Sequence, residues 1–218
     1  MKLKKGIAVL CAFALLITAA GAAAFTDTQG HWAAAYIDDI ASSGLVAGYD
    51  DGSFKPDKAV TNAEALAFVS RLWKGDAATV AAVQKKWQSV LTASLPSAYS
   101  WLQDEAAVCL EAGVLTQSEF AALCTSGALG SAAKKVNLAV WLVKAMQLSP
   151  LAATYDTDSL TFTDTASITA AARPYVALLA AAGITVGDDL GNFAPASEVT
   201  RGVVATMLSR SLDYMEDN

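Results

Sequence analysis

The hydrophobic positions of this chain recur at helical spacing and are interrupted by glycine-rich turns. Residues 32–40 place tryptophan, tyrosine and isoleucine at successive i+4 steps, which is typical of one apolar face of a helix. Gly44 follows, where a glycine can adopt the left-handed conformation that closes a helix. Thr61-x-x-Glu64 is a capping box. A helix, a turn and a second helix beginning at about residue 62 are therefore predicted.

The same arrangement recurs near the end of the chain. Residues 183–200 repeat the glycine and threonine pattern of residues 44–61, with the same spacing between the closing glycine and the threonine. Between them we predict a divergent third copy, in which Gly113 ends a helix and Asn137 caps the next one, seven residues later than in the other copies. A recurring unit of this kind indicates a repeat protein.

Two further capping signals lie in the middle of the chain. Thr116-x-x-Glu119 is a second capping box, which predicts that the extra residues after Gly113 form a short helix through Leu123. Asp76 is placed to cap a connector helix that leads into the divergent copy.

These residues resemble the S-layer homology (SLH) domain of bacterial envelope proteins. The resemblance is dense in the first copy and good in the last, whereas the middle copy is recognisable mainly by position and by Trp101. The residues that carry it in the first copy are Phe25-Thr26-Asp27, Gly30-His31-Trp32-Ala33, Tyr36-Ile37, Gly48-Tyr49, Asp51-Gly52-Ser53-Phe54, Pro56 and Val60-Thr61 with Glu64. The last copy keeps Phe162-Thr163-Asp164, Gly187, Gly191, Phe193, Pro195 and Thr200-Arg201.

The resemblance and the repeat pattern together predict the organisation of the chain. We expect a mainly α protein, with three helix-loop-helix SLH repeats arranged as a pseudo-threefold helical bundle. The first segment is residues 25–75, the middle segment is residues 76–150 with the connector helix and the divergent repeat, and the last segment is residues 151–218.

Residues 1–24 have the order of a secretory signal peptide. Three lysines precede an apolar run, which is followed by small residues suited to a signal peptidase. The run is too short for a membrane span, so we expect a secreted protein at the cell wall or cell surface, with no membrane span once the signal is removed. The remaining chain has 12 basic and 21 acidic residues, about −9, which argues against nucleic acid as a partner.

The resemblance also implies a function. SLH repeats bind secondary cell-wall polymers, including pyruvylated sugars, in grooves beside the start of each second helix, where an arginine can pair with an anion. Arg201 keeps that arginine, whereas Asn62 and Leu138 are predicted to replace it in the other two copies. The expected glycan-binding residues are Trp32, Gly48, Tyr49, Asn62, Gly187, Thr200 and Arg201. For Trp32, packing in the core is the alternative to lining a sugar groove.

Catalytic chemistry is not indicated. His31 is the only histidine, and we interpret it as a structural residue near a helix start; no metal site, cofactor site or nucleophile with its base is recognisable. The chain is therefore predicted to be a non-catalytic module whose partner is a secondary cell-wall polymer or a peptidoglycan-linked glycan. The alternative is an envelope protein-interaction or structural module with degenerate grooves.

Cys109 and Cys124 are the cysteines that remain after residues 1–24. In an exported protein such a pair suggests a disulfide that pins the inserted helix. The alternative is two buried thiols, and the sequence leaves both open.

Overall fold

The chain is described by a computed structural model that covers residues 25–73 and 75–218. Within these residues the protein is mainly helical and has isolated β-bridges but no β-strand, which confirms the predicted class. The α-helices are α1 (Ala34–Ser42), α2 (Asn62–Ser70), α3 (Ala77–Ser94), α4 (Gln103–Glu111), α5 (Gln117–Thr125), α6 (Lys135–Ala145), α7 (Ser149–Ala152), α8 (Arg173–Ala181) and α9 (Arg201–Asp217). The 3-10 helices are η1 (Ser97–Leu102), η2 (Ala128–Gly130), η3 (Thr157–Ser159) and η4 (Thr165–Ser167).

Three short extended stretches meet at the centre of the molecule and bond to one another in a closed ring. The N–H of Val60 donates to the carbonyl of Val199 over 3.0 Å, and that of Val199 to Ala133 over 3.0 Å. The N–H of Ala133 closes the ring on Val60 over 2.8 Å, and all three side chains are buried. Each stretch leads directly into a helix, so the ring sets the starts of α2, α6 and α9 around one axis. This confirms the predicted pseudo-threefold arrangement.

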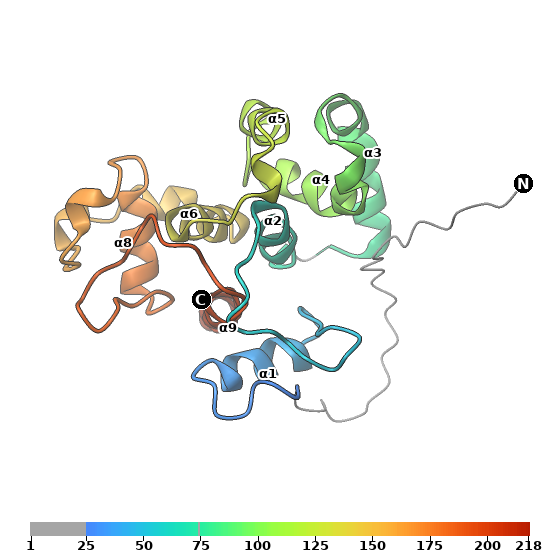
Figure 1. The fold of residues 1–218 in the computed structure, drawn as a ribbon. Coiled ribbons are helices and arrows are strands. Elements are labelled where there is room, and N and C mark those ends of the chain that lie inside the picture. The colour runs from blue at the N-terminus through green and yellow to red at the C-terminus, as the bar shows by residue number, and fades with distance from the viewer. Residues whose placement is uncertain (1–24, 74) are drawn as a thin grey trace, which may run out of the picture.

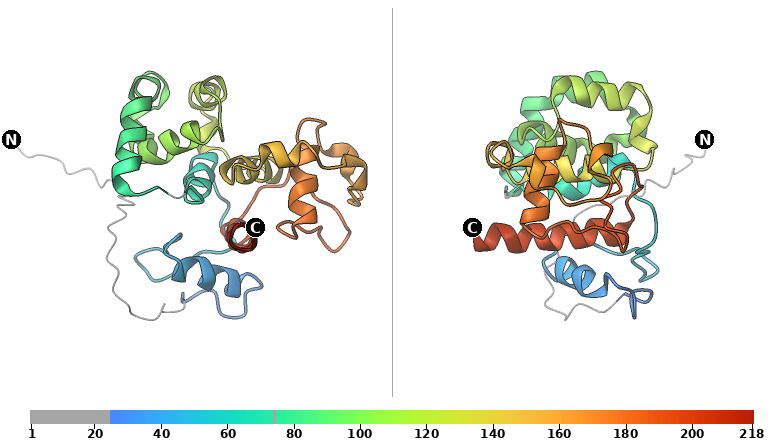
Figure 2. Two further views of the ribbon diagram at one scale, coloured as in Figure 1. Left: turned by 180° about the vertical axis from the view of Figure 1, so that it is seen from behind. Right: turned by 90° about the vertical axis from the view of Figure 1, so that its left-hand side faces the viewer.

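The helices pair across segments. Helix α1 of the first segment packs on α9 of the last, α4 of the middle segment packs on α2 of the first, and α8 of the last packs on α6 of the middle. Figure 1 shows α9 end-on near the centre with α1 beside it, and the right-hand view of Figure 2 shows α9 lengthwise above α1. Each segment therefore covers an apolar face of another, and the last helix closes the ring on the first.

An aspartate at the start of the first and last segments holds the loop that precedes the second helix. The Asp27 carboxylate accepts the N–H groups of Phe54 and Lys55, both at 2.8 Å. Asp164 does the same for Phe193 and Ala194, both also at 2.8 Å. The donating residue pairs match in position, so this contact explains why the Phe-Thr-Asp sequence recurs with the glycine-rich loop.

A basic residue at the tenth position counted from the start of each ring-linked helix ties that helix to the first helix of its own segment. Each side chain donates to a carbonyl at or just after the glycine that closes the first helix. The contacts are Arg71 to Leu45 at 2.7 Å, Lys144 to Val114 at 3.3 Å and Arg210 to Gly183 at 3.4 Å. We did not identify this recurrence from the sequence, although the equal spacing is visible there once the helix starts are known.

The prediction that Asn137 caps the second helix of the middle segment is wrong. Helix α6 begins at Lys135 with Lys134 at the N-cap position, and Asn137 lies inside its first turn. No side chain caps this helix, because the ring hydrogen bond at Ala133 sets its start instead. The insertion relative to the other segments is therefore four residues and not seven, and Lys135, not Leu138, is the counterpart of Arg201.

The other predicted caps are confirmed. Thr61 and Glu64 form a reciprocal capping box on α2, and Thr116 with Glu119 forms one on α5. The Asp76 side chain caps α3 through the N–H of Thr79, as the sequence predicted.

Of the two alternatives for the cysteines, the structure shows two buried thiols and not the disulfide. Cys109 and Cys124 are both buried free thiols. The Cys109 thiol donates to the carbonyl of Leu66 over 3.5 Å, which places it in the contact between α4 and α2. Burial raises the pKa of both thiols, so both stay protonated and unreactive at neutral pH.

The predicted signal peptide, residues 1–24, lies outside the described residues. Among the helices of the described part, none combines the length and the apolar character that crossing a bilayer requires.

Candidate functional site

The threefold arrangement creates three junctions where the start of one helix meets the loop of another segment. We call them the α9 junction (loop 47–58), the α6 junction (loop 186–197) and the α2 junction (residues 128–131). At each, the first helical N–H donates to a carbonyl of that loop. The bonds are Arg201 to Lys58, Lys135 to Ser197 and Asn62 to Ser131, each at 2.9 Å. The three junctions share a backbone plan, and their side chains differ.

Arg201 is a buried structural residue of the α9 junction. Its relative exposure is 8%. Its Nε donates to the carbonyl of Phe54 over 2.7 Å, and its Nη2 to the carbonyl of Ala47 over 3.2 Å. The guanidinium carbon also lies 4.4 Å from the ring centroid of Phe54. Two donors of Arg201 therefore hold the neighbouring loop, and the expected pairing of this residue with an anion stays a prediction.

Tyr49 is the point on which the cations of the α9 junction converge. The Arg201 guanidinium carbon lies 5.0 Å from the centre of its ring, and the Lys55 ammonium 4.1 Å. The Lys58 ammonium lies 5.3 Å from the ring centre and donates to the phenolic oxygen over 2.9 Å. The face of an aromatic ring attracts cations, so one tyrosine organises three positive groups.

The two lysines are accessible to solvent and paired with carboxylates. The side chain of Lys55 is 43% exposed and lies 3.3 Å from Asp51, and that of Lys58 is 47% exposed and lies 3.7 Å from Glu64. The hydrogen bond to Tyr49 raises the pKa of Lys58 against the opposing effect of burial, so this lysine is charged at neutral pH. Hydrogen bonds from Ser53 lower the pKa of Asp51 to about 2.

Trp32 also lies beside the start of α9. It is 60% exposed and precedes α1, so the alternative that it packs in the core is wrong. Its ring centroid is 5.3 Å from that of His31, and a Cβ added to Gly202 would lie 3.2 Å from Cε1 of the same histidine. Trp32 therefore presents an open aromatic face next to the α9 junction.

His31 is fixed by two contacts. Its Nδ1 accepts the N–H of Ala33 over 3.1 Å, and its Nε2 lies 3.2 Å from Asp57. This arrangement confirms that His31 is a structural histidine near a helix start.

Gly48 and Thr200 shape the backbone of the α9 junction. A Cβ on Gly48 would lie 2.4 Å from Phe25 and 2.7 Å from the carbonyl of Ser53, so only glycine fits there. The Thr200 hydroxyl accepts the N–H of Val203 over 3.4 Å and caps α9. Both predicted site residues therefore lie at this junction through their backbone and packing.

The α6 junction carries a different set of charged residues. The Lys135 ammonium lies 4.9 Å from the ring centroid of Phe193. Burial lowers the pKa of Lys135, and the carboxylates of Asp188 and Asp164 act in the other direction. Gly187 belongs to this loop, where a Cβ would lie 3.1 Å from the backbone of Gly191. The structure therefore separates Gly187 from Arg201.

Asn62 lies at the α2 junction and is also separated from the rest of the predicted site. It is 6% exposed, and its Nδ2 donates to the carbonyl of Ala128 over 2.9 Å. No hydrogen-bond partner of its Oδ1 is found within the described residues.

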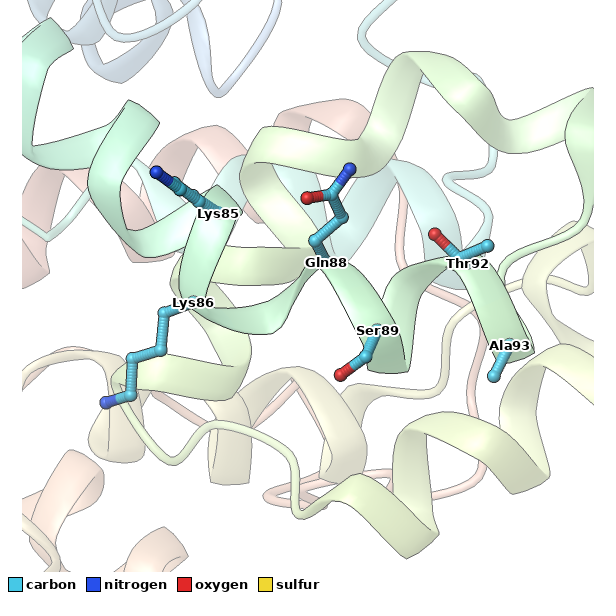
Figure 3. A pocket seen from close by; sticks show the side chains of 6 residues that line it. All are labelled: Lys85, Lys86, Gln88, Ser89, Thr92 and Ala93. Carbon is cyan, nitrogen blue, oxygen red and sulfur yellow. The ribbon is translucent and has the colours of Figure 1, made fainter.

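Two surface hollows of the described residues lie away from the α9 junction. One follows a single face of α3 and is lined by Lys85, Lys86, Gln88, Ser89, Thr92 and Ala93 (Figure 3). Because one helix supplies all six side chains, this hollow has no opposing wall to enclose a ligand. Another lies between the end of α8 and the last turns of α9, around Gly183 and Tyr214. In the part of the chain that the structure describes, no group of three or more histidine, cysteine or acidic side chains is placed to hold a metal.

The α9 junction therefore brings together Trp32, Gly48, Tyr49, Thr200 and Arg201 from the predicted set. Lys55 and Lys58 were not predicted. Their signal in the sequence was two lysines three residues apart, immediately before the Thr61 capping box.

Comparison with known proteins relates this junction to a family. Residues 24–66 and 161–202 match the family described as the S-layer homology domain. A stretch of 47 residues is 40% identical to Cell surface glycoprotein 1 of Acetivibrio thermocellus. Another match, of 45 residues, is 38% identical to the Cellulosome-anchoring protein of the same organism. These stretches cover 22% and 21% of this chain but only 2% and 10% of the two relatives.

The two family matches meet in space. The first contains loop 47–58, and the second ends at Gly202, in the first turn of α9. Stretches that match the S-layer homology domain therefore lie on both sides of the α9 junction.

Proposed function

We propose that this chain is a non-catalytic module of the cell envelope that attaches to an anionic secondary cell-wall polymer at the α9 junction. The observation that carries the proposal is the convergence of Lys55, Lys58 and Arg201 on the ring of Tyr49. The whole chain has a formal charge of −6, so general attraction cannot hold it on an anionic polymer. A local cationic site is needed, and the α9 junction supplies one.

The sugar part of such a ligand fits the neighbouring aromatic surface. Trp32 exposes 60% of its surface beside the start of α9. The flat apolar face of an indole covers the apolar face of a sugar ring, while its N–H is available to a hydroxyl group. A polymer that combines sugar rings with anionic substituents therefore matches both halves of the site.

The family match supports this assignment, since it covers both parts of the α9 junction, and the printed names of the relatives refer to the cell surface and to anchoring. We propose further that residues 76–150 form a divergent third SLH repeat between segments 25–75 and 151–218. Secretion directed by residues 1–24, and a location at the cell wall or cell surface, belong to the same proposal.

A second candidate is an envelope protein-interaction module. Val186 and Leu190, in the loop of the last segment, are 57% and 78% exposed. Exposed apolar side chains of this kind are found at protein interfaces. In this alternative the partner is a protein of the envelope, and the α9 junction contributes only to the fold.

Sedimentation with purified cell-wall sacculi distinguishes the two. The chain is mixed with sacculi from the species that encodes it, either intact or after chemical removal of the secondary polymer. Polymer attachment predicts that the chain sediments only with the intact sacculi. Equal sedimentation with both preparations, or with neither, contradicts it.

A further inference from the structure

We infer that Lys55 and Lys58, and not Arg201, are the groups that meet the anionic substituent of the ligand, above the ring of Tyr49. This inference rests on the proposed function and specifies the chemistry of the same site. It also predicts one anion site per chain, because the equivalent positions at the α6 junction have the opposite character.

The first step is the position of Arg201. Two of its donors already serve the carbonyls of Phe54 and Ala47, and its side chain is covered by the loop that it holds. Turning this guanidinium towards a ligand would leave the buried Phe54 carbonyl unsatisfied, which is unfavourable. Arg201 is therefore a positioning residue that holds loop 47–58 and lies against Tyr49.

The second step is the accessibility of the lysines. Both ammonium groups lie on Tyr49, and nearly half of each side chain faces solvent. Their carboxylate partners are also held by other donors: Asp51 accepts from Ser53, and Glu64 accepts from Thr61 in the capping box. An incoming anion can therefore contact the ammonium groups without displacing a buried partner.

The third step is the comparison with the last segment. The two loops have the same backbone, since Lys55 has φ 58° and its counterpart Ala194 has φ 56°. However, Tyr49 is replaced by Asp188, and Lys58 is replaced by Ser197. The cation of the α6 junction that acts with Asp188, Lys135, is partly buried, whereas Lys55 and Lys58 are exposed.

At the third junction, the α2 junction, the counterpart of Arg201 is the buried and uncharged Asn62. Of the three junctions, the α9 junction is therefore the one at which two exposed lysines gather on an aromatic ring.

The experiment compares matched lysines in the sedimentation assay described above. The test variants are Lys55→Gln, Lys58→Gln and the double variant, and the control is Lys134→Gln. Lys134 is 42% exposed and lies 3.2 Å from Glu198, so it matches Lys55 in exposure and in its ion pair. Thermal melts of all variants establish that each is folded.

We expect the double variant to bind intact sacculi at least about tenfold more weakly than the parent, with Lys134→Gln unchanged. Tyr49→Phe keeps the ring but loses the phenolic oxygen, so it should lose less binding to intact sacculi than the double variant does. Acetate and inorganic phosphate are then compared as competitors, and the more effective one identifies the substituent as a carboxylate or a phosphate. Release of the chain from the sacculi by either anion supports the site.

Two outcomes overturn the inference while leaving the proposed function in place. One is polymer-dependent binding of the double variant with the affinity of the parent. The other is an equal loss in Lys134→Gln, which would show a general effect of charge. If the parent itself does not sediment with intact sacculi, the proposed function fails, and the inference fails with it.

Discussion

Replacing Arg201 by alanine tests the structural role that the fold assigns to this residue. The substitution removes the donor to the Phe54 carbonyl and the donor to the Ala47 carbonyl, which tie the start of α9 to loop 47–58. It also removes the cation that lies over the rings of Phe54, Tyr49 and Phe68. Because α9 closes the ring of helix pairs on α1, the loss acts on the contact between the two ends of the fold.

The magnitude follows from the burial of each contact. Ala47 is exposed, so water can replace the arginine at its carbonyl, and this bond contributes little. The bond to Phe54 is buried, and a hydrogen bond to a charged group contributes about 1.5 to 3 kcal/mol. Contact with the aromatic rings adds about 0.5 to 1 kcal/mol. The free energy of unfolding should therefore fall by about 2 to 4 kcal/mol.

Urea denaturation followed by circular dichroism measures this change. A loss of this size lowers the melting temperature of a chain of this length by about 4 to 16 °C. Arg201→Lys keeps the charge but cannot make both bonds, so it should lie between alanine and the parent. Lys135→Ala changes the equivalent but partly exposed position at the α6 junction, and it should cost less than Arg201→Ala.

If Arg201→Ala unfolds at the same urea concentration as the parent, the hydrogen bonds at the α9 junction do not hold the fold together. The same conclusion follows if Lys135→Ala is the more destabilising of the two.

Two further predictions concern the first segment. Thr61→Ala removes the side-chain cap of α2 and should lower the free energy of unfolding by about 1 kcal/mol in thermal melts, and an unchanged melt would show that the cap is not needed. Burial opposes ionisation of Asp27, but the N–H groups of Phe54 and Lys55 outweigh it and lower its pKa. A carboxylate whose pKa is lower in the folded than in the unfolded chain stabilises the fold at pH values above its ordinary pKa near 3.8. This stabilisation is lost as the pH falls through the lower pKa of the folded state. Asp27→Asn should therefore show a smaller loss of stability between neutral pH and about pH 3 than the parent, and equal losses would contradict this assignment.

The parts of the fold that the sequence predicts are those set by local chemistry. Thr61 with Glu64, Thr116 with Glu119, and Asp76 each satisfy backbone donors within three residues, so their helix starts are visible in the sequence. The closing glycines are visible for the same reason: Gly44 and Gly183 have φ 71° and 67°, a region that other residues rarely adopt.

The start of α6 was placed wrongly because nothing local sets it. Its N-cap residue, Lys134, has no side-chain acceptor, whereas Asn137 is a residue type that commonly caps helices. The hydrogen bonds that set this start come from Val60 and Val199, which lie more than 60 residues away in the chain. A pattern read within a window of a few residues does not contain this information.

The candidate site was predicted in part for a related reason. Trp32, Tyr49 and Arg201 were identified, and the structure places them around one helix start. The burial of Arg201 was missed, since the carbonyl that covers it belongs to a residue 147 positions earlier. Lys55 and Lys58 were missed because two lysines three residues apart indicate a site only once the tyrosine that gathers them is located.

The most direct test of the account is to locate the bound polymer on the chain. Amide chemical shifts of the isotope-labelled protein are recorded during titration with purified fragments of the secondary cell-wall polymer. The account predicts that the largest changes fall on Trp32, on Tyr49 to Lys58 and on the first turn of α9, with residues 186–197 little affected. Changes centred on α3 or on residues 186–197, with none around Tyr49, would contradict it.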